Sequence, residues 1–519
     1  MLDSCSTLWR VRIVSTIACA GMLALPACRI PNLRNADAMP IVPAEFNVPI
    51  GTDSTPPVAA LVGGMAIATQ PNGSSSSENS GRLGIAEFYN DATLVQLIDQ
   101  AIAGNRELKI LDEEVQIASN EIMARRGAYL PFLTAGGSAG FEKTSRYTRN
   151  GAVEEGLPIL PDQPFPNPLP NYMGGLNLFW ELDIWRKLRN ARDAAAARYT
   201  AAIEKRNYFA TTLVAEVAEK YYNLMALDQR IVTLNQTIEL QQQSLSISIA
   251  KKDAGRGTEL AVQRFQAEVN KNQSEKLIVR QDIVEAENRI NFLLNRFPEP
   301  VPRSSVGFYD LTIHDLSVGT PAELLQNRAD IRQAERELTA TGLDILVARA
   351  AFYPSVSITA GLGTQIFNPR YIVNPQALAA DLTGHIVAPL LNKKAIRADF
   401  MSANARQLQS LYNYQRVILN AFTEVYNRVT MAENYRTSIE IKKQQLQALE
   451  ASVDTASKLF QNARAEYIEV LFAQRDLLEA RTVMIETKKQ QLTAIVNAYQ
   501  ALGGGYALPI PVPIPVPTR

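Results

Sequence analysis

The sequence predicts a mainly α-helical protein with membrane β-strands, because its second half repeats its first and both halves have the same parts. Each half contains two stretches of about ten residues in which apolar and polar residues alternate, followed by one long helical hairpin. An offset of 208 residues, 397 − 189, pairs Arg189 with Arg397 and Leu294 with Leu502. A duplicated unit of this size predicts a fold built from pseudo-equivalent parts, expected here at 85–297 and 328–503.

The composition gives little support to an enzyme or a nucleic-acid-binding protein. The 519 residues include 52 basic and 52 acidic ones, so the net charge offers no attraction to nucleic acid. Two histidines and three cysteines are too few for a zinc cluster, and no set of nucleophile, base and metal ligands is visible. The glycines of 503–505 follow a helical stretch, which favours a helix stop over a phosphate loop. We therefore expect no catalysis, no cofactor and no metal.

The N-terminus has the features of an export signal. Basic residues precede an apolar run from Ile13 to Ala27, which is too short to span a membrane as a mature helix. Leu25-Pro26-Ala27-Cys28 resembles the bacterial lipobox, although Pro26 departs from the usual small residue. This pattern predicts a signal peptide at 1–27 and lipidation of Cys28. The alternative is an ordinary secretory signal cut near Ala27, with Cys28 as a plain thiol.

Two segments flank the predicted repeats. The first, 28–84, is rich in Pro, Gly, Ser and Asn and predicts a flexible, lipidated tether. The second is the Pro-rich tail, 504–519, in which alternate prolines favour an extended polyproline conformation.

Four stretches predict β-strands, near 132–145, 173–185, 355–367 and 380–391. In the third, for example, Val356 and Ile358 alternate with Ser357 and Thr359, which places apolar and polar side chains on opposite faces. Each stretch has the length of a tilted membrane-spanning strand. The alternative is two amphipathic hairpins that pack on the helices of a water-soluble protein.

Four strands cannot form a membrane barrel alone. Every backbone donor and acceptor must be paired in lipid, so an open sheet is excluded there. The smallest bacterial single-chain barrels have about eight strands. If these strands span a membrane, two or three chains must share one barrel.

The remaining sequence predicts two helical hairpins, 189–297 and 395–502, separated by a linker at 298–327. Short polar turns interrupt the hairpins at 253–258 and 462–466. A sustained seven-residue period of this length specifies coiled-coil packing. The period in the second hairpin runs through Ile418, Val425, Ala432, Ile439, Leu446, Val453 and Phe460.

Several motifs resemble the TolC-like outer-membrane efflux proteins, in particular the lipoprotein branch that serves resistance–nodulation–division (RND) pumps. The resemblance is carried by the lipobox and by the segments 329–335, 348–354, 467–475 and 501–506. It implies a homotrimer with a twelve-stranded barrel, four strands per chain, and a helical tunnel through the periplasm. An equatorial region would draw on 83–100, 298–327 and the segment after Gly503.

The resemblance also implies a passive exit duct for an efflux system. Its partners would be a periplasmic adaptor (membrane fusion protein), an inner-membrane pump of the RND type and outer-membrane lipid. A type I secretion channel is the runner-up within the family. A lipid-tethered periplasmic scaffold without a barrel is the third alternative, and detergent-dependent outer-membrane fractionation would distinguish it.

Alignment with the family suggests residues for the periplasmic end of the duct. Glu469 falls where an acidic pore residue is often found, and Phe472 falls where an aspartate is usual, so both are candidates for the constriction. With Phe472 at that position, either the constriction is apolar there or the helix is rotated away from the axis. Three copies of Glu469 would form a negative ring that favours cations. The alternative for Glu469 is a solvated helix face. Four residues at the turns are candidates for adaptor contact or, equally, ordinary solvated residues: Asp253, Arg256, Arg464 and Glu466.

Overall fold

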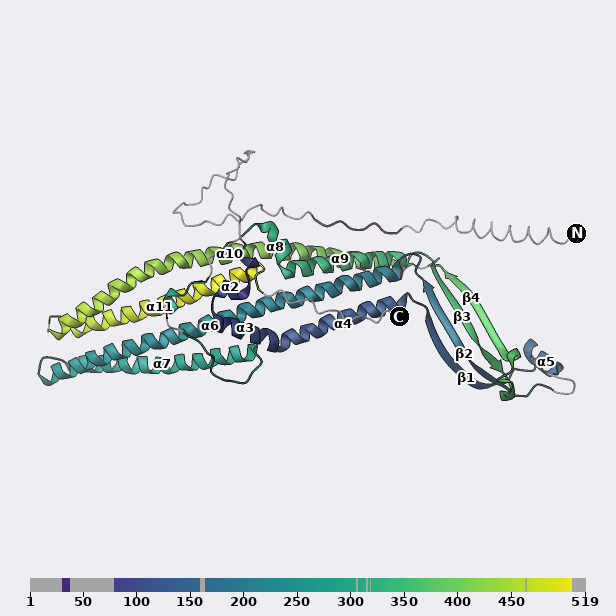
Figure 1. Ribbon diagram of the computed structural model, residues 1–519, viewed down its shortest axis with the longest axis horizontal. Helices are drawn as coiled ribbons and strands as arrows, with labels where there is room; N and C mark the ends of the chain where they lie inside the picture. The colour runs from purple at the N-terminus through teal and green to yellow at the C-terminus, as the bar shows by residue number, and fades with distance from the viewer. Residues whose placement is uncertain are drawn as a thin grey trace, which may run out of the picture. The chain divides into compact units, whose positions relative to one another are not determined.

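The computed structural model, shown in Figure 1, describes residues 30–37, 79–158, 164–304, 307–313, 316–317, 319–391, 393–462 and 464–505. The predicted signal peptide, Cys28 and residues 506–519 of the predicted tail lie outside these ranges. Contacts divide the chain into two compact units. Of the described residues, unit 1 comprises 30–37, Ile117–Tyr199 and Arg336–Tyr412, and unit 2 comprises 79–116, Thr200–Glu335 and 413–505. Among the described residues, no helix combines the length and the apolarity needed to cross a membrane.

Unit 1 contains one antiparallel sheet with strands in the order β1-β2-β3-β4. Its register separates the side chains by polarity. Thr134, Asn177, Gly361 and Asp381 form one cross-strand row, and the residues next to them form an apolar row on the opposite face: Leu133, Leu178, Ala360 and Leu382. The strands are β1 (Phe132–Glu142), β2 (Leu169–Leu182), β3 (Ser355–Ile366) and β4 (Leu378–Val387).

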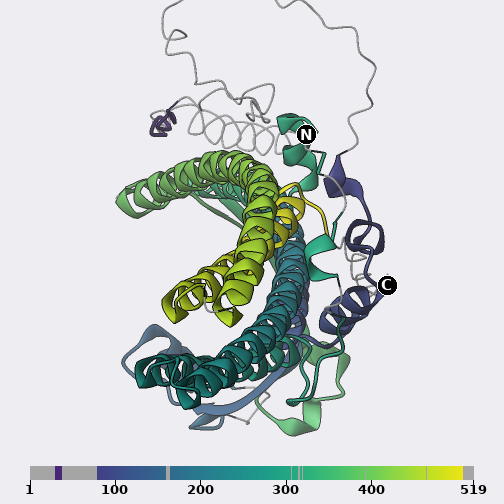
Figure 2. The same cartoon turned by 90° about the vertical axis from the view of Figure 1, so that its left-hand side faces the viewer.

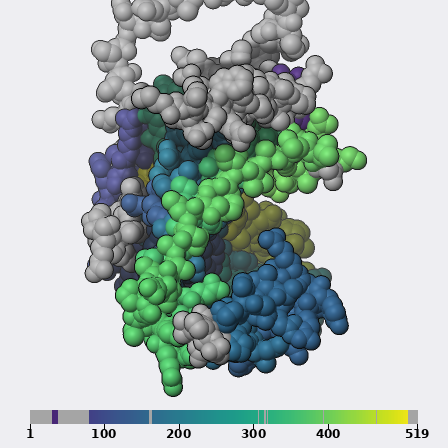
Figure 3. Space-filling view, turned by 90° about the vertical axis from the view of Figure 1, so that its right-hand side faces the viewer, coloured from purple at the N-terminus to yellow at the C-terminus, as the bar shows by residue number. Residues whose placement is uncertain are grey.

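The β1–β2 and β3–β4 loops, at one end of the sheet, pack against each other. The β1–β2 loop includes helix α5 (Arg149–Gly156), and Phe165 of this loop lies 6.0 Å, between ring centres, from Phe367 after β3. Figure 3 looks at this end, with the β1–β2 loop in blue beside the β3–β4 loop in green. The loops therefore form a common rim on unit 1.

The second predicted strand ends three residues earlier than its pattern suggests. Asp183, expected within the strand, instead accepts the N–H groups of Leu188 and Arg189 at 2.9 Å each. These bonds satisfy free donors at the first turn of α6 (Lys187–Asp253). Because Asp183 caps the helix, β2 stops at Leu182 and Ile184 lies in the connecting turn.

The start of the predicted tether is packed on unit 1. Ile30 contacts an apolar cluster of Ile345, Phe352, Phe400 and Ala403, which joins α9 (Ala329–Ala350), the turn between α9 and β3, and α10 (Lys394–Gln461). Further along, the N–H of Arg34 donates to Oδ1 of Asn404 at 2.9 Å. The prediction of a flexible tether is therefore wrong for residues 30–37, because apolar burial and hydrogen bonds fix this segment. It is also wrong for 79–84, where Ser80–Arg82 forms a short 3-10 helix.

Unit 2 contains most of the two long hairpins, from Thr200 of the first and Asn413 of the second, and Figure 2 views the hairpins from their turns. The first pairs α6 with α7 (Glu259–Leu293), and the second pairs α10 with α11 (Tyr467–Ala501). The predicted heptad residues of α10 are buried except for Leu446, which is half-buried. Shorter helices complete the unit: α2 (Ile85–Tyr89), α3 (Ala92–Gly104), α4 (Arg106–Ala128, its first half) and α8 (Pro321–Asn327), with a 3-10 turn at Phe308–Asp310.

The internal repeat recurs at the ends of the two return helices. After α7, Asn295 has a φ of 57°, and at the position 208 residues later Gly503 has a φ of 87°. In both places, a residue in the left-handed conformation ends the helix. The N–H of the following residue then donates to a carbonyl of the last helical turn: Arg296 to Asn291, and Gly504 to Tyr499. The predicted helix stop at 503–505 is confirmed.

Candidate functional site

Two short turns close the hairpins of unit 2. In the first, Gly255 has a φ of 67°, and its N–H donates to the carbonyl of Lys252 at 2.9 Å. In the second, the N–H of Arg464 donates to the carbonyl of Leu459 at 2.8 Å. The four predicted turn residues are all exposed: Asp253, Arg256, Arg464 and Glu466.

The two turns lie side by side because Lys251 of α6 reaches the end of α10. Its Nζ lies 3.7 Å from the centre of the Phe460 ring and donates to the carbonyl oxygen of Phe460. That carbonyl is among the last of α10, where a cation complements the helix dipole. Phe265 packs on Phe460 from α7, and Val470 of α11 completes the cluster. Burial lowers the pKa of Lys251.

The predicted constriction residues occupy the free face of α11. Glu469 is exposed and Phe472 is 52% exposed, whereas Val470, Gln474 and Leu477 are buried against the other helices. The structure thus brings Glu469 and Phe472 onto one side of the helix. Within this chain, both side chains point away from the packed core of the hairpins.

Sequence reasoning missed two residues near this end of the hairpins, Lys251 and Gln474. Lys251 lies in the last turn of a helix, where a basic residue is common, so its position gave a signal. Its partner, Phe460, could not be predicted from the sequence. Gln474 occupies a buried heptad position of α11 among apolar residues, and a polar residue at such a position was the available signal.

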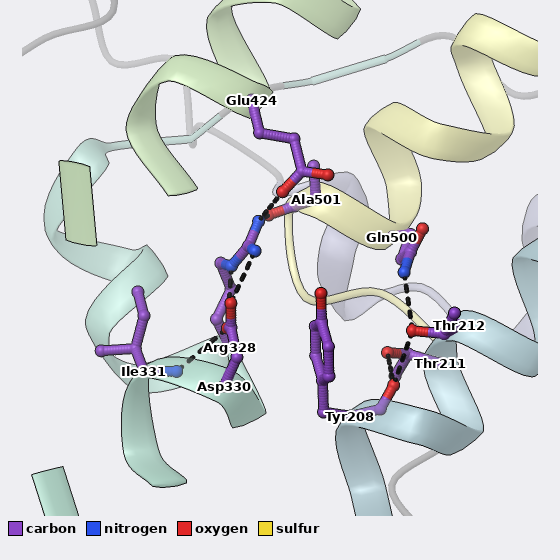
Figure 4. A network of polar contacts seen from close by, with 9 residues as sticks. All are labelled: Tyr208, Thr211, Thr212, Arg328, Asp330, Ile331, Glu424, Gln500 and Ala501. Atoms are coloured by element: carbon purple, nitrogen blue, oxygen red, sulfur yellow. Dashed lines mark hydrogen bonds and ion pairs between the residues drawn. The ribbon is translucent and has the colours of Figure 1, made fainter. Parts of the chain in front are cut away.

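A buried arginine joins three helices at the other end of the second hairpin, as Figure 4 shows. Arg328, only 3% exposed, follows α8 and makes two hydrogen bonds to the carboxylate of Asp330, at 2.8 and 3.0 Å. Its Nη1 donates to Glu424 of α10 and to the carbonyl of Ala501 in α11, both at 2.9 Å. Burial alone would lower the pKa of Arg328, but the two carboxylates raise it above its ordinary value.

The pseudo-equivalent position in the first repeat makes the corresponding contact. Asn105 precedes Arg328 by the offset that relates Ala128 to Ala351, since 328 − 105 and 351 − 128 both equal 223. Its Nδ2 donates to the carbonyl of Leu293 at 3.0 Å, and Leu293 precedes Ala501 by 208 residues. Each repeat therefore ties the end of its return helix to the start of the helix that leads to its sheet strands.

The family is decided by a match that runs through both repeats. The model of the family described as "Outer membrane efflux protein" matches residues 97–296 and 320–504, ranges that contain the whole sheet and both hairpins. The chain belongs to this family. The predictions of an outer-membrane location and of an exit channel for efflux are therefore confirmed.

Individual relatives agree with the assignment of this chain to the efflux family. It is similar to the cation efflux system protein CusC of Escherichia coli (strain K12), with 26% identity over 430 residues that cover 83% of this chain and 90% of CusC. It is similar to the probable outer membrane lipoprotein SilC of Salmonella typhimurium, with 24% identity over 423 residues that cover 82% and 88%. Among solved structures, the outer-membrane channel OprN matches with a TM-score of 0.75 at 25% identity, over 88% of this chain and 99% of OprN. The predicted mainly helical fold with a small sheet is thus confirmed.

Proposed function

We propose that three copies of this chain close their sheets into one twelve-stranded barrel in the outer membrane. The support lies in the edges of the sheet: β1 and β4 each pair with one strand only among the described residues. Lipid tolerates such an edge only when another strand pairs with it. Three chains of four strands supply twelve, an even number within the range of bacterial barrels.

The two faces of the sheet fit the two environments of such a barrel. The apolar row that includes Leu178 and Leu382 would face lipid, and the polar row that includes Asn177 and Asp381 would line the lumen. This separation of polar and apolar rows, on a sheet with two open edges, is the observation that carries the proposal. A water-soluble sheet would need to cover the apolar face.

The hairpins would form the periplasmic wall of the duct and end at its partners. The adaptor would contact the exposed turn residues Asp253, Arg256, Arg464 and Glu466, and the inner-membrane pump would be of the RND type. The duct itself would conduct passively, and the pump would supply the energy without catalysis by this chain.

Glu469 and Phe472 would form the constriction at the periplasmic end. Both side chains lie on the free face of α11. In the trimer, the three copies of each side chain would meet at the common axis. Three Glu469 carboxylates would attract cations and repel anions. Phe472 would make the neighbouring level of the constriction apolar.

The function is tested by deleting the gene and measuring sensitivity to dyes, detergents, antibiotics and metal salts. We expect increased sensitivity to at least one class, restored by the full-length gene. The purified protein should need detergent and should migrate as a trimer that dissociates into monomers on heating. A monomer that stays in solution without detergent would contradict the proposal.

Lipidation of Cys28 would hold the N-terminus at the outer membrane. The packing of 30–37 on unit 1 supports this, because Ile30, two residues after Cys28, packs on the apolar cluster that includes Phe352, three residues before β3. Replacement of Cys28 by serine is expected to abolish incorporation of radioactive palmitate while the chain is still exported. Equal incorporation by the Cys28→Ser variant would show that Cys28 is not the acylated residue.

A further inference from the structure

A buried polar seam runs along the C-terminal part of α6, at positions where a coiled coil normally has apolar residues. Its residues recur at intervals of four, three and four, and each is at most 5% exposed: Thr237, Gln241, Ser244 and Ser248. The hydroxyls of this seam donate to carbonyls of their own helix, for example Ser248 to Ser244 at 2.8 Å and Ser244 to Leu240 at 3.1 Å. These bonds satisfy the hydroxyl hydrogens without involving a neighbouring helix.

Two hydrogen bonds connect the seam to its neighbouring helices. Nδ2 of Asn272 in α7 donates to Oε1 of Gln241 at 2.9 Å, and Nε2 of Gln474 in α11 donates to Oγ of Ser244 at 3.0 Å. Asn272 is 2% exposed and Gln474 is 4% exposed, so neither amide can exchange its partner for bulk water. A buried polar group left without a partner costs free energy, so each pair opposes rotation and sliding of its helices.

The bond between Gln474 and Ser244 shows which side of α11 is turned toward α6. At 3.6 residues per turn, Phe472 lies about 160° from Gln474 around the helix, and Glu469 about 140° from it on the other side. Both are therefore held on the face opposite α6 when Gln474 is bonded to Ser244. Val470, about 40° from Gln474, is buried with it.

The first hairpin contains a glutamine at the repeat-equivalent position that makes no such contact. Gln266, 208 residues before Gln474, is exposed, and its Nε2 donates to Asn270 of its own helix at 2.9 Å. The link to another helix is therefore specific to Gln474 and not a general feature of the repeat.

We propose that Gln474 is a positioning residue, which holds α11 through Ser244 so that Glu469 and Phe472 face the axis of the duct. The functional part of this inference rests on the proposed pore role of Glu469. The part of the inference that concerns the rotation of α11 is independent of that role, because it concerns only which residues of α11 are buried.

Thiol labelling of the detergent-solubilised full-length protein tests the rotation. Cysteine is introduced by Val470→Cys or by Phe472→Cys, and the rate of labelling by a maleimide is measured with and without Gln474→Leu. We expect rapid labelling for Phe472→Cys and slow labelling for Val470→Cys, with the difference reduced when Gln474→Leu is added. Ser244→Ala removes the same bond from the other side and is expected to have the same effect. Gln266→Leu is the matched control and should leave both rates unchanged.

Ion selectivity in planar bilayers tests the functional consequence. Glu469→Gln is expected to lower the cation preference, which tests the pore role itself. Gln474→Leu and Ser244→Ala keep the charge of Glu469 and are also expected to lower the cation preference, whereas Gln266→Leu is not. An unchanged preference in Glu469→Gln would refute the pore role alone. Unchanged labelling rates in both Gln474→Leu and Ser244→Ala would overturn the positioning role, whatever Glu469 does.

Discussion

Replacement of Arg328 by methionine is expected to destabilise the protein by about 3 kcal/mol, the lower end of the range for breaking a buried ion pair. The change removes the hydrogen-bond donor to Asp330, Glu424 and the carbonyl of Ala501 in one step. Methionine keeps most of the side-chain volume, so the loss reflects the unpaired acceptors more than a cavity. The two carboxylates keep some contact with water, which is why we expect the lower end of the range.

The matched control for Arg328→Met is Arg436→Met. Arg436 also pairs with a glutamate, Glu433, at 2.9 Å, but its side chain is exposed and both residues lie on one turn of the same helix. Loss of such a surface pair is expected to cost less than about 1 kcal/mol. Chemical unfolding in detergent, followed by circular dichroism, measures both. Similar losses for the two variants would mean that burial of Arg328 adds nothing to its contribution.

The second large effect is expected in the sheet, where Gly175→Ala should prevent normal pairing of β2 with β3. A methyl group on Gly175 would lie 2.6 Å from the Cα of Gly363 and 2.6 Å from the carbonyl oxygen of Leu362. Both are backbone atoms of the paired strand, so no side-chain rotation can relieve the contact. Overpacking usually costs about 1–3 kcal/mol, and a clash between backbones lies at or above the upper end.

Gly174→Ala is the control, because a methyl group on Gly174 would meet no atom within 4 Å. Both variants add one methyl group to the same strand, at adjacent positions that face opposite sides of the sheet. We expect Gly174→Ala to yield the heat-dissociable trimer at normal levels and Gly175→Ala to yield little of it. Gel migration with and without heating is the measurement. Normal trimer from Gly175→Ala would show that the two strands can separate without loss of the sheet.

Much of the fold could be predicted because its periodic patterns are local. Alternation identified all four strands, and the heptad through Ile418 and Phe460 identified the long helix of the second hairpin. The ends of elements were less predictable where a side chain has two possible roles. Asp183 continues the alternation of β2, but its carboxylate is worth more as a cap of α6 than as a strand residue.

The contacts between hairpins could not be predicted, because nothing in a single sequence pairs residues so far apart. Lys251 and Phe460 are 209 residues apart, and Ser244 and Gln474 are 230 apart. The candidate constriction was found only by resemblance, and its residues follow a helix face whose orientation depends on Gln474. The packing of residues 30–37 was missed because composition alone favoured a tether, although Ile30 provides the apolar anchor.

The contacts of α6 with the second hairpin also limit which insertions and deletions the protein can tolerate. Ser244 and Lys251 are seven residues apart, two turns of a helix, and both reach across to the second hairpin. One codon inserted between them would turn Lys251 by about 100° away from Phe460, although every side chain would be retained. Insertions and deletions are therefore expected to survive in the loops that join the strands and to be eliminated from the hairpins, where the number of residues is constrained as tightly as their identity.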